Sequence, residues 1–240
     1  MAARAPAGTV LTGISSMATR QILADLCEQY QRETGVRVEV EAVGGVDAAR
    51  RVLAGEVFDL VVLADTAIEQ LAAAGKVDPA GRIELVRSTM VAAVRAGAPQ
   101  PDLASPEAVR QAVLGARRIG YSSGPSGVHL QGLFAEWGIA EKILPRTVQA
   151  SPGVPVGSLI AEGKVDLGFQ QLSELMDLPG VEVIGPLPPP IGLDTGFVAA
   201  PSTATGRSEA VRDFLSFLGS PATAAAKRRR GLAPGRVAGV

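Results

Sequence analysis

The stretch Val52-Leu-Ala-Gly-Glu-Val-Phe-Asp-Leu60 decides the fold, because a similar stretch, Leu159-Ile-Ala-Glu-Gly-Lys-Val-Asp-Leu167, follows later in the chain. Each stretch carries the end of a helical pattern, a glycine, a charged residue, and then Asp-Leu at the start of an apolar run. Glycine is common just after a helix, and a continuous apolar run is typical of a strand covered on both faces. We therefore expect each stretch to build the same helix-to-strand corner in a separate lobe. Two similar lobes suit 240 residues better than one long sheet.

Short apolar runs alternate with helical patterns along nearly the whole chain. The expected strands cover residues 8–14, 36–43, 57–64, 90–95, 117–121, 165–170, 181–184 and 196–200. The expected helices cover residues 17–33, 46–54, 66–74, 106–114, 127–137, 154–162, 207–218 and 221–230. In the first helix an apolar stripe repeats at helical spacing through Ile22, Leu26 and Tyr30. The alternation predicts an α/β fold in which mostly parallel sheets are flanked by helices.

Two turn-rich segments are the expected crossings between the lobes. One lies near residues 87–91, and the other is the proline-rich segment 185–192, in which Pro188 to Pro190 favour an extended backbone. The chain is thus expected to begin in lobe one, build lobe two and return. We place lobe one at residues 1–88 and 192–240, and lobe two at residues 89–191.

The composition excludes several classes of function. A net charge of −1 and only six Phe, two Tyr and one Trp argue against a nucleic-acid partner, which needs positive charge and aromatic rings for stacking. One cysteine, Cys27, and one histidine, His129, exclude an internal disulfide and any metal site built from several of these residues. We expect Cys27 to be a buried thiol and the basic run 227–230 to be a solvated helix face.

Neither a membrane span nor a targeting segment is evident. No stretch approaches the ~18–20 apolar residues that cross a bilayer. The first residues, Met1-Ala-Ala-Arg-Ala-Pro6, contain no apolar core of signal-peptide length. The compartment is therefore left open: the protein is periplasmic if a leader was removed, and cytoplasmic otherwise.

Two strand-to-helix loops of the first lobe are candidate ligand loops, because ligands of open parallel sheets bind beyond the carboxyl ends of the strands. Ser15 and Ser16 offer hydroxyls beside free backbone N–H groups, which is anion-binding chemistry, and plain helix capping is the alternative. Gly44 and Gly45 let the backbone approach a ligand closely. Their alternative is a tight turn with Asp47 as the helix cap.

The second lobe offers three further loops. The segment 121–129 concentrates serines, glycines and the single histidine before a helix, and its candidate ligand residues are Ser123, Ser126, Gly127 and His129. The alternative for the histidine is a structural hydrogen bond. A turn before the next helix adds Gly153 and Val154. Gln170 and Gln171 end a strand of buried character, where an amide is unusual unless paired, and the alternative for both is capping or packing within the fold.

The order of these elements, with a set of motifs along nearly the whole chain, resembles the periplasmic solute-binding proteins of the molybdate-binding type. The motifs are Gly13-Ile-Ser-Ser-Met-Ala-Thr-Arg20, Glu33-Thr-Gly-Val36, the run from Leu53 to Ala64, Ala73-Ala-Gly-Lys-Val77 and Phe214-Leu-Ser-Phe-Leu-Gly-Ser-Pro-Ala-Thr-Ala-Ala-Ala226. The resemblance implies a type II periplasmic-binding fold whose two lobes, joined by two crossing segments, close on a ligand. Members of this group hold a small dianion with neutral donors, mainly serine hydroxyls, backbone N–H groups and a tyrosine.

Departures from the pattern of that group point to a different ligand. Gly44 and Gly45 replace a serine-rich loop, and Gln171 stands where the tyrosine would fall. The altered loops resemble a subgroup that carries Ser-Gly-Val/Ile-His and Gln-Gln-Leu/Ile-Ser-Glu, and their donors suit a carboxylate larger than molybdate. Arg20, one turn into the first helix, would add a bidentate carboxylate clamp, and a surface charge is its alternative.

Two functions follow from the resemblance. The favoured one is a monomeric solute-binding protein that captures a small carboxylate or oxyanion in a cleft between the lobes, without metal or cofactor, and passes it to the membrane permease of an ABC-type transporter. The alternative is an enzyme similar to bacterial aconitate isomerase, which shifts a proton along an allylic carboxylic acid without a cofactor. His129 would then be the catalytic proton carrier, and the donors that hold the carboxylates would stabilise an enolate-like intermediate.

Overall fold

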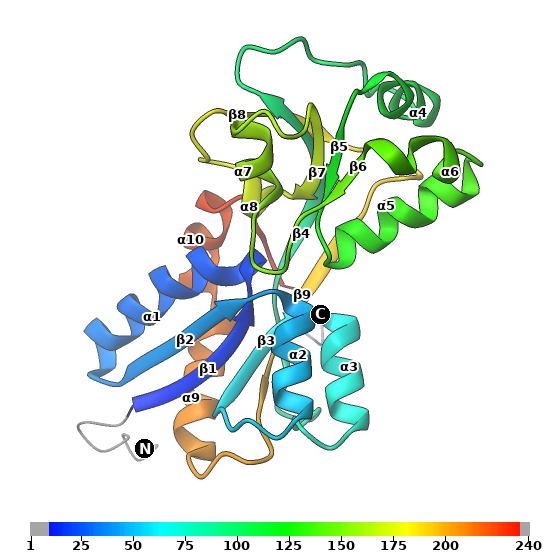
Figure 1. Ribbon diagram of the computed structural model, residues 1–240. Coiled ribbons are helices and arrows are strands. Elements are labelled where there is room, and N and C mark those ends of the chain that lie inside the picture. Colours follow the sequence, from blue (N-terminus) through cyan, green and yellow to red (C-terminus); the bar gives the residue numbers. More distant parts are fainter. Residues whose placement is uncertain (1–9, 236–240) are drawn as a thin grey trace. The chain divides into compact units, whose positions relative to one another are not determined.

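The computed structural model describes residues 10–235, and contacts within the chain divide them into two units (Figure 1). Unit 1 holds the described residues up to Arg87 and those from Gly196 onward, and unit 2 runs from Ser88 to Thr195. Both divisions fall inside strands, β4 (Ile83–Arg95) and β9 (Asp194–Pro201). The chain therefore passes from one unit to the other in mid-strand, and the second passage follows the proline-rich segment 185–192 instead of lying within it.

Unit 1 is a sheet with helices on both faces. Its parallel strands follow the order β2-β1-β3, with bounds β1 (Val10–Ser16), β2 (Arg37–Val43) and β3 (Leu60–Ala64). Strand β9 pairs antiparallel with β3, and β10 (Ala233–Pro234) pairs antiparallel with β4. The helices are α1 (Arg20–Thr34), α2 (Gly45–Leu53), α3 (Asp65–Ala73), α9 (Ser208–Gly219) and α10 (Ala224–Arg229), with 3-10 turns η1 (Met17–Thr19) and η3 (Pro221–Thr223).

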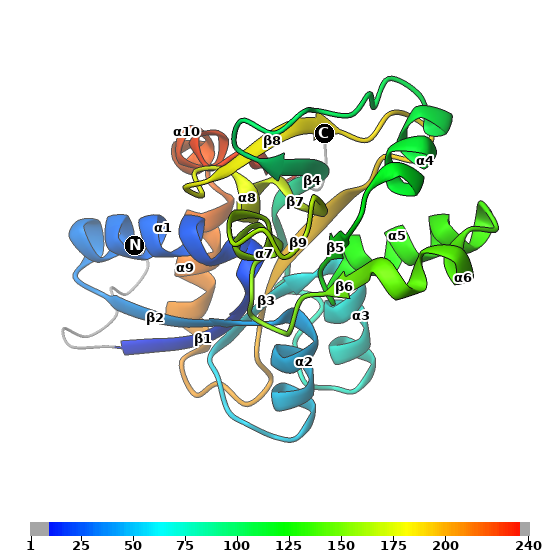
Figure 2. The ribbon, with the colours of Figure 1, turned by 45° about the horizontal axis from the view of Figure 1, so that its top comes forward.

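Strand β3 is apolar without alternation because both of its faces are covered. Leu60 and Val62 belong to the core that contains the buried faces of α1 and α9. Val61 and Leu63 belong to a second core, which contains those of α2 and α3. The two pairs of helices lie on opposite sides of β3 (Figure 2). Each side chain of the strand is therefore withdrawn from water, which is the condition that the apolar run predicts.

Unit 2 repeats this plan with other helices. Its parallel strands follow the order β6-β5-β7, with bounds β5 (Ile119–Tyr121), β6 (Thr147–Gln149) and β7 (Leu167–Gln171). Strands β7 and β8 (Val181–Pro186) each pair antiparallel with β4. The helices are α4 (Pro106–Gly115), α5 (Pro125–Glu136), α6 (Ala140–Ile143), α7 (Val156–Ala161) and α8 (Leu172–Leu175), with the 3-10 turn η2 (Leu144–Arg146).

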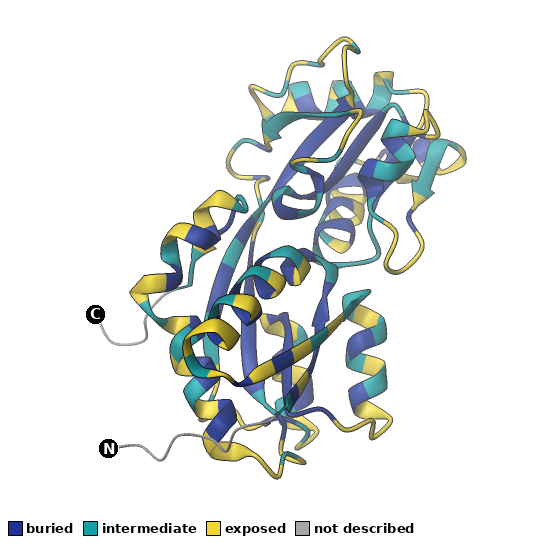
Figure 3. Ribbon diagram, turned by 90° about the vertical axis from the view of Figure 1, so that its left-hand side faces the viewer, coloured by how far each residue is buried: buried dark blue, intermediate teal, exposed yellow. Residues whose placement is uncertain are grey.

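Helices cover both faces of this second sheet as well. One core joins α4, α5 and α6 to the strands, and another joins α7 and α8 to them. On β4 the faces alternate, because Met90 and Ala92 belong to the first core and Val91 and Ala93 to the second. Figure 3 shows the resulting pattern, with strands that are mostly buried and helices that are exposed on their outer sides.

The predicted α/β fold is confirmed. The antiparallel pairs of β4, β8, β9 and β10 were not foreseen, and they accompany the strands in which the chain passes between the units. The helix expected at 17–33 is divided into η1 and α1. Strand β6 and the helices α6 and α8 have only three or four residues each, too few to leave a periodic signal in the sequence.

The predicted corner forms at both places. In unit 1 the N–H of Asp59 donates to the carbonyl of Thr12 at 2.8 Å, and the carboxylate of Asp59 accepts from the N–H of Thr12 at 2.9 Å. In unit 2 Asp166 makes the same two bonds with Arg118, at 3.0 and 2.9 Å. Each pair stands one residue before a parallel strand pairing, Gly13 with Leu60 or Ile119 with Leu167. The aspartates therefore fix the register of both parallel pairs.

The corner at Asp59 is more buried than the corner at Asp166. Its carboxylate also accepts from the Thr205 hydroxyl at 2.7 Å and lies 3.3 Å from the Arg207 guanidinium, which ties the segment before α9 to β3. Burial alone would raise the pKa of Asp59, but the bonds from Thr205 and Thr12 and the charge of Arg207 outweigh it and hold the pKa below its usual value.

The basic run 227–230 was expected to be a solvated helix face, and this is wrong for its first residue. Lys227 is not part of a solvated face: it is 2% exposed, and its Nζ donates to the carbonyl of Leu218 at 2.6 Å, at the end of α9. The last carbonyls of a helix need donors, which the run of charge in the sequence does not reveal. Burial lowers the pKa of Lys227 to about 8. Cys27 is buried as predicted, and burial raises its pKa to about 12.

Between residues 10 and 235, no helix has the length and apolar character needed to cross a membrane.

Asp59→Asn is expected to lower the free energy of unfolding by about 2–4 kcal/mol, because one carboxylate oxygen becomes an NH₂ that faces other donors. Since the folded protein lowers the pKa of Asp59, its contribution is present above the unfolded-state pKa of about 4 and is lost as the pH falls below that value. Urea unfolding of both proteins from neutral to acidic pH measures the loss and its pH dependence.

The matched control is Asp166→Asn. Its cost should be smaller, because the side chain of Asp166 is 34% exposed and that of Asp59 is 4% exposed. Equal losses in the two variants, or parallel acid profiles for the wild type and Asp59→Asn, would contradict this account of the corner.

Candidate ligand-binding site

The two candidate loops of unit 1 meet at the carboxyl ends of its parallel strands. Strand β1 ends at Ser16, which pairs with Val43 at the end of β2. A Cβ built at Gly45, the first residue of α2, would lie 3.6 Å from the Cβ of Ser16. The loop after β1 and the loop after β2 therefore form one surface.

Ser15 and Ser16 are buried without hydrogen-bond partners for their hydroxyls. Ser15 is 0% exposed and Ser16 is 7% exposed, and neither Oγ bonds to any described group. The capping alternative fails for both: Ser15 lies within β1, and Ser16 precedes η1 but makes no side-chain cap bond. A buried hydroxyl without a partner costs about 1–3 kcal/mol, so this pair calls for an explanation outside the fold.

The second loop of unit 1 offers backbone donors. Gly44 precedes α2, whose first intrahelical bond runs from the N–H of Ala48 to the carbonyl of Gly44. The N–H groups of the first turn, starting with Gly45, have no partner within the helix. Asp47 does not cap this helix, because its carboxylate pairs with Arg50 at 2.6 Å. The predicted clamp residue Arg20 is exposed at the start of α1.

The loop after β5 is tightly built around Ser126 and Gly127. The hydroxyl of Ser126, a residue 1% exposed, lies 3.0 Å from that of Ser122. A Cβ at Gly127 would stand 1.7 Å from the carbonyl oxygen of Ser122, so no side chain fits there. Ser123 is half-buried in the same loop. Ser126 is thus bonded within the fold, and it differs in this respect from Ser15 and Ser16.

His129 makes a structural hydrogen bond. Its Nε2 lies 2.9 Å from the carbonyl oxygen of Ile191, in the segment that leads to β9. Because a carbonyl only accepts, Nε2 must carry the hydrogen, and Nδ1 is the ring nitrogen left for other chemistry. The bond favours the structural interpretation of His129, and contact with a ligand stays a prediction.

The adjacent glutamines at the end of β7 differ in their partners. Gln170 is used by the fold at both ends of its amide, because its Oε1 accepts from the N–H of Val156 at 2.7 Å and its Nε2 donates to Glu174 at 2.7 Å. Gln170 thus caps α7, as its alternative predicted. Gln171 is 2% exposed, its Nε2 bonds to Thr195, and its Oε1 has no described partner.

The loop before α7 is the least supported of the five. Gly153 adopts a positive φ of 78° in a turn closed by a bond from the N–H of Val154 to the carbonyl of Ser151. The first N–H of α7, that of Val156, is occupied by Gln170. Sequence reasoning also missed Thr195, since a threonine within a strand carries no local signal.

Comparison with known proteins identifies the family to which this chain belongs. A family model described as bacterial extracellular solute-binding protein matches residues 11–233. The chain belongs to this family. It is also 32% identical over 231 residues to the aconitate isomerase of Pseudomonas sp, a match that covers 94% of this chain and 88% of that protein.

Solved structures of solute-binding proteins share the fold. The periplasmic molybdate-binding protein of Azotobacter vinelandii aligns with a TM-score of 0.77 at 20% identity, over 94% of this chain and 100% of that one. The sulfate-binding protein SubI of Mycobacterium tuberculosis H37Rv aligns with a TM-score of 0.75 at 17% identity, over 94% and 87%. The resemblance expected from the sequence motifs, and the periplasmic-binding fold that it implies, are confirmed.

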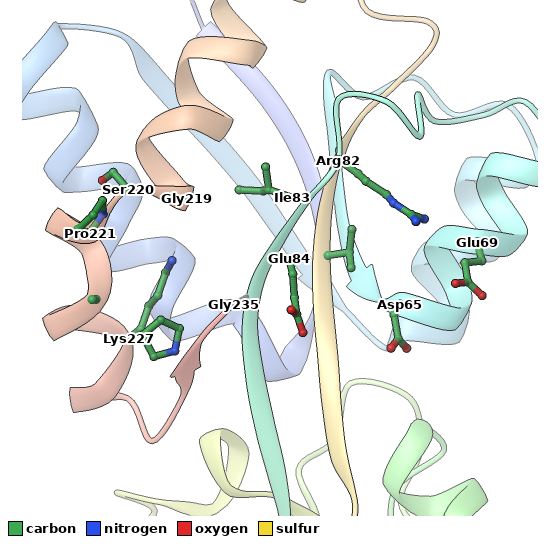
Figure 4. Close-up of a pocket in the computed structure, with 13 residues that line it drawn as sticks. Asp65, Glu69, Arg82, Ile83, Glu84, Gly219, Ser220, Pro221, Lys227 and Gly235 are labelled. Atoms are coloured by element: carbon green, nitrogen blue, oxygen red, sulfur yellow. The ribbon is translucent and has the colours of Figure 1, made fainter. Parts of the chain in front are cut away.

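A pocket of this solute-binding protein contains none of the candidate residues. It has a volume of about 520 Å³ and lies within unit 1 (Figure 4). Carboxylates of Asp65, Glu69 and Glu84 line it, together with Arg82 and Lys227. Three carboxylates on the wall disfavour an anion, so the pocket is not where the predicted ligand would bind.

Ser15→Ala should leave the free energy of unfolding within about 0.5 kcal/mol of the wild-type value or raise it, because it removes a buried hydroxyl that has no partner. The matched change Ser126→Ala should lower it by about 1 kcal/mol, because Ser122 loses a bonded neighbour. Urea unfolding of the ligand-free variants measures both. A clear loss of stability in Ser15→Ala would show that its hydroxyl is bonded in the free protein.

Proposed function

We propose that this protein binds a small organic carboxylate and passes it to the membrane permease of an ABC-type transporter, with Ser15, Ser16 and Gln171 as the candidate uncharged donors. One observation carries the proposal. Of the four buried side-chain polar atoms that lack a partner within the described residues, three belong to these candidate residues: Ser15 Oγ, Ser16 Oγ and Gln171 Oε1. A serine hydroxyl without a partner inside the fold can donate to a bound carboxylate, and the Gln171 amide can donate through Nε2, whereas its Oε1 only accepts.

Exposed apolar side chains beside the candidate loops support an organic ligand over a bare oxyanion. Val46, Val128 and Val154 are 58%, 65% and 41% exposed, and each directly follows a candidate glycine. Ligand sites combine a few polar groups with apolar walls that contact a carbon skeleton. The relative from Pseudomonas is named for aconitate, which is such a carboxylate. In this proposal the protein acts as a periplasmic monomer.

Calorimetric titration with molybdate, sulfate, succinate, citrate, tricarballylate and trans-aconitate tests the proposal. At least one carboxylate should bind with a micromolar Kd and more tightly than either oxyanion. Ser15→Ala and Gln171→Ala should each weaken that binding about tenfold or more, since each removes one hydrogen bond to a charged group. Ser216→Ala, a change at an exposed serine of α9, is the control and should bind as the wild type does. If no carboxylate binds better than millimolar, the proposal fails.

The 32% identity to aconitate isomerase over nearly the whole chain favours a second candidate, a cofactor-free isomerase. A base would remove a proton from one carbon, the double bond would shift, and a proton would return two carbons away. Backbone and hydroxyl donors on the carboxylate would stabilise the enolate-like intermediate. Because Nε2 of His129 is bonded to Ile191, Nδ1 would carry the proton.

Proton NMR of the protein incubated with trans-aconitate tests this candidate. For an isomerase the cis isomer accumulates to equilibrium, and His129→Ala slows its formation about 100-fold or more, the usual contribution of a general base. Full activity in His129→Ala would remove the histidine from the mechanism. A wild-type protein that binds trans-aconitate without converting it is a binding protein only.

A further inference from the structure

Gln171 differs from its neighbour Gln170 in that no partner fixes the orientation of its amide. The partners of Gln170 cannot exchange roles, because a backbone N–H only donates and the carboxylate of Glu174 only accepts. Within the described residues, the single partner of the Gln171 side-chain amide is the hydroxyl of Thr195, at 2.7 Å. A hydroxyl both donates and accepts, so the same contact satisfies either amide orientation.

Thr195 and Gln171 are both buried where their side chains meet. Thr195 is 5% exposed in β9, and Gln171 is 2% exposed at the end of β7. Strand β4 lies between β7 and β9 in the sheet, and Met90 of β4 is the direct pairing partner of Gln171. The hydroxyl therefore reaches the amide across β4 at Met90, which is 0% exposed.

An anion distinguishes the two orientations of the amide. When Nε2 bonds to Thr195, one N–H of the amide is used there and Oε1 stays an unpaired acceptor, which an anion repels. When the amide is turned by half a rotation, the Thr195 hydroxyl donates to Oε1 and Nε2–H is free to donate to the anion. The second orientation leaves no buried atom unpaired once the anion is bound.

We infer that Thr195 is a positioning residue for ligand binding: its hydroxyl donates to Gln171 Oε1 in the bound state and thereby presents Gln171 Nε2–H to a carboxylate. The inference rests on the proposed function, since it needs a carboxylate at Gln171. In the ligand-free protein the hydroxyl can serve either orientation of the amide, and the bound carboxylate selects the one in which Nε2–H faces it. Thr195 itself touches no ligand.

Thr195→Val and Thr195→Ser test this role, with the tightest-binding of succinate, citrate, tricarballylate and trans-aconitate as the probe. Valine keeps the shape without the hydroxyl and should raise the Kd about tenfold, whereas serine keeps the hydroxyl and should stay within about threefold of the wild type. In a Gln171→Ala background, Thr195→Val should have no further effect, because the residue acts only through the amide.

Two readouts separate positioning from a merely structural role. The side-chain NH₂ signals of Gln171, assigned by their absence in Gln171→Ala, should shift on binding in the wild type and in Thr195→Ser but not in Thr195→Val. Thr89→Val is the matched control, because it removes the bond from the Thr89 hydroxyl of β4 to Asp194, the residue of β9 next to Thr195, and should leave the Kd unchanged.

The outcomes distinguish the inference from the proposed function. If the wild type binds none of the four carboxylates, the proposed function fails and the role of Thr195 fails with it. If the wild type binds one of them and Thr195→Val binds it equally well, the proposed function stands and the role of Thr195 is wrong. Equal weakening by Thr195→Val and Thr89→Val would also overturn it, since the effect would then belong to the strands.

Discussion

The reciprocal bonds of two aspartates with the backbone of a neighbouring strand are the constraint on which the rest of this structure depends. Asp59 holds β3 in register with β1, and Asp166 holds β7 in register with β5. A slip by one residue would turn every side chain of a strand to the opposite face. The positions of Ser16 at the end of β1 and of Gln171 at the end of β7 therefore follow from these two corners.

The candidate residues differ in how far the fold already uses them. Gln170, Ser126 and His129 each bond to another part of the chain, so their polar atoms serve packing first. Ser15 and Gln171 keep buried atoms that have no partner among residues 10–235. Such atoms reduce the stability of the free protein by about 1–3 kcal/mol each, and a bound ligand would offset that loss. A local conflict of this kind is expected where function, rather than stability, has selected the residue.

Much of the fold could be predicted from local patterns, and the partners of individual side chains could not. The apolar run of β3 and the repeated Asp-Leu corner are properties of a few adjacent residues, and both predictions are confirmed. The rule that ligands bind at strand ends located Ser15 and Gln171. The same rule also selected Gln170, because the sequence does not distinguish two adjacent glutamines. Only the fold shows that the N–H of Val156 donates to Gln170.

The sequence by itself determined the α/β class, the two helix-to-strand corners and the membership of a solute-binding family, because periodicity and motif order are written along the chain. Only the tertiary structure decided which polar groups are hydrogen-bonded within the fold. Lys227 bonds to the end of α9, His129 to Ile191, and Gln171 to Thr195. The physical reason is that these bonds join segments 9 to 62 residues apart, and a side chain meets such a partner only after the strands and helices have packed.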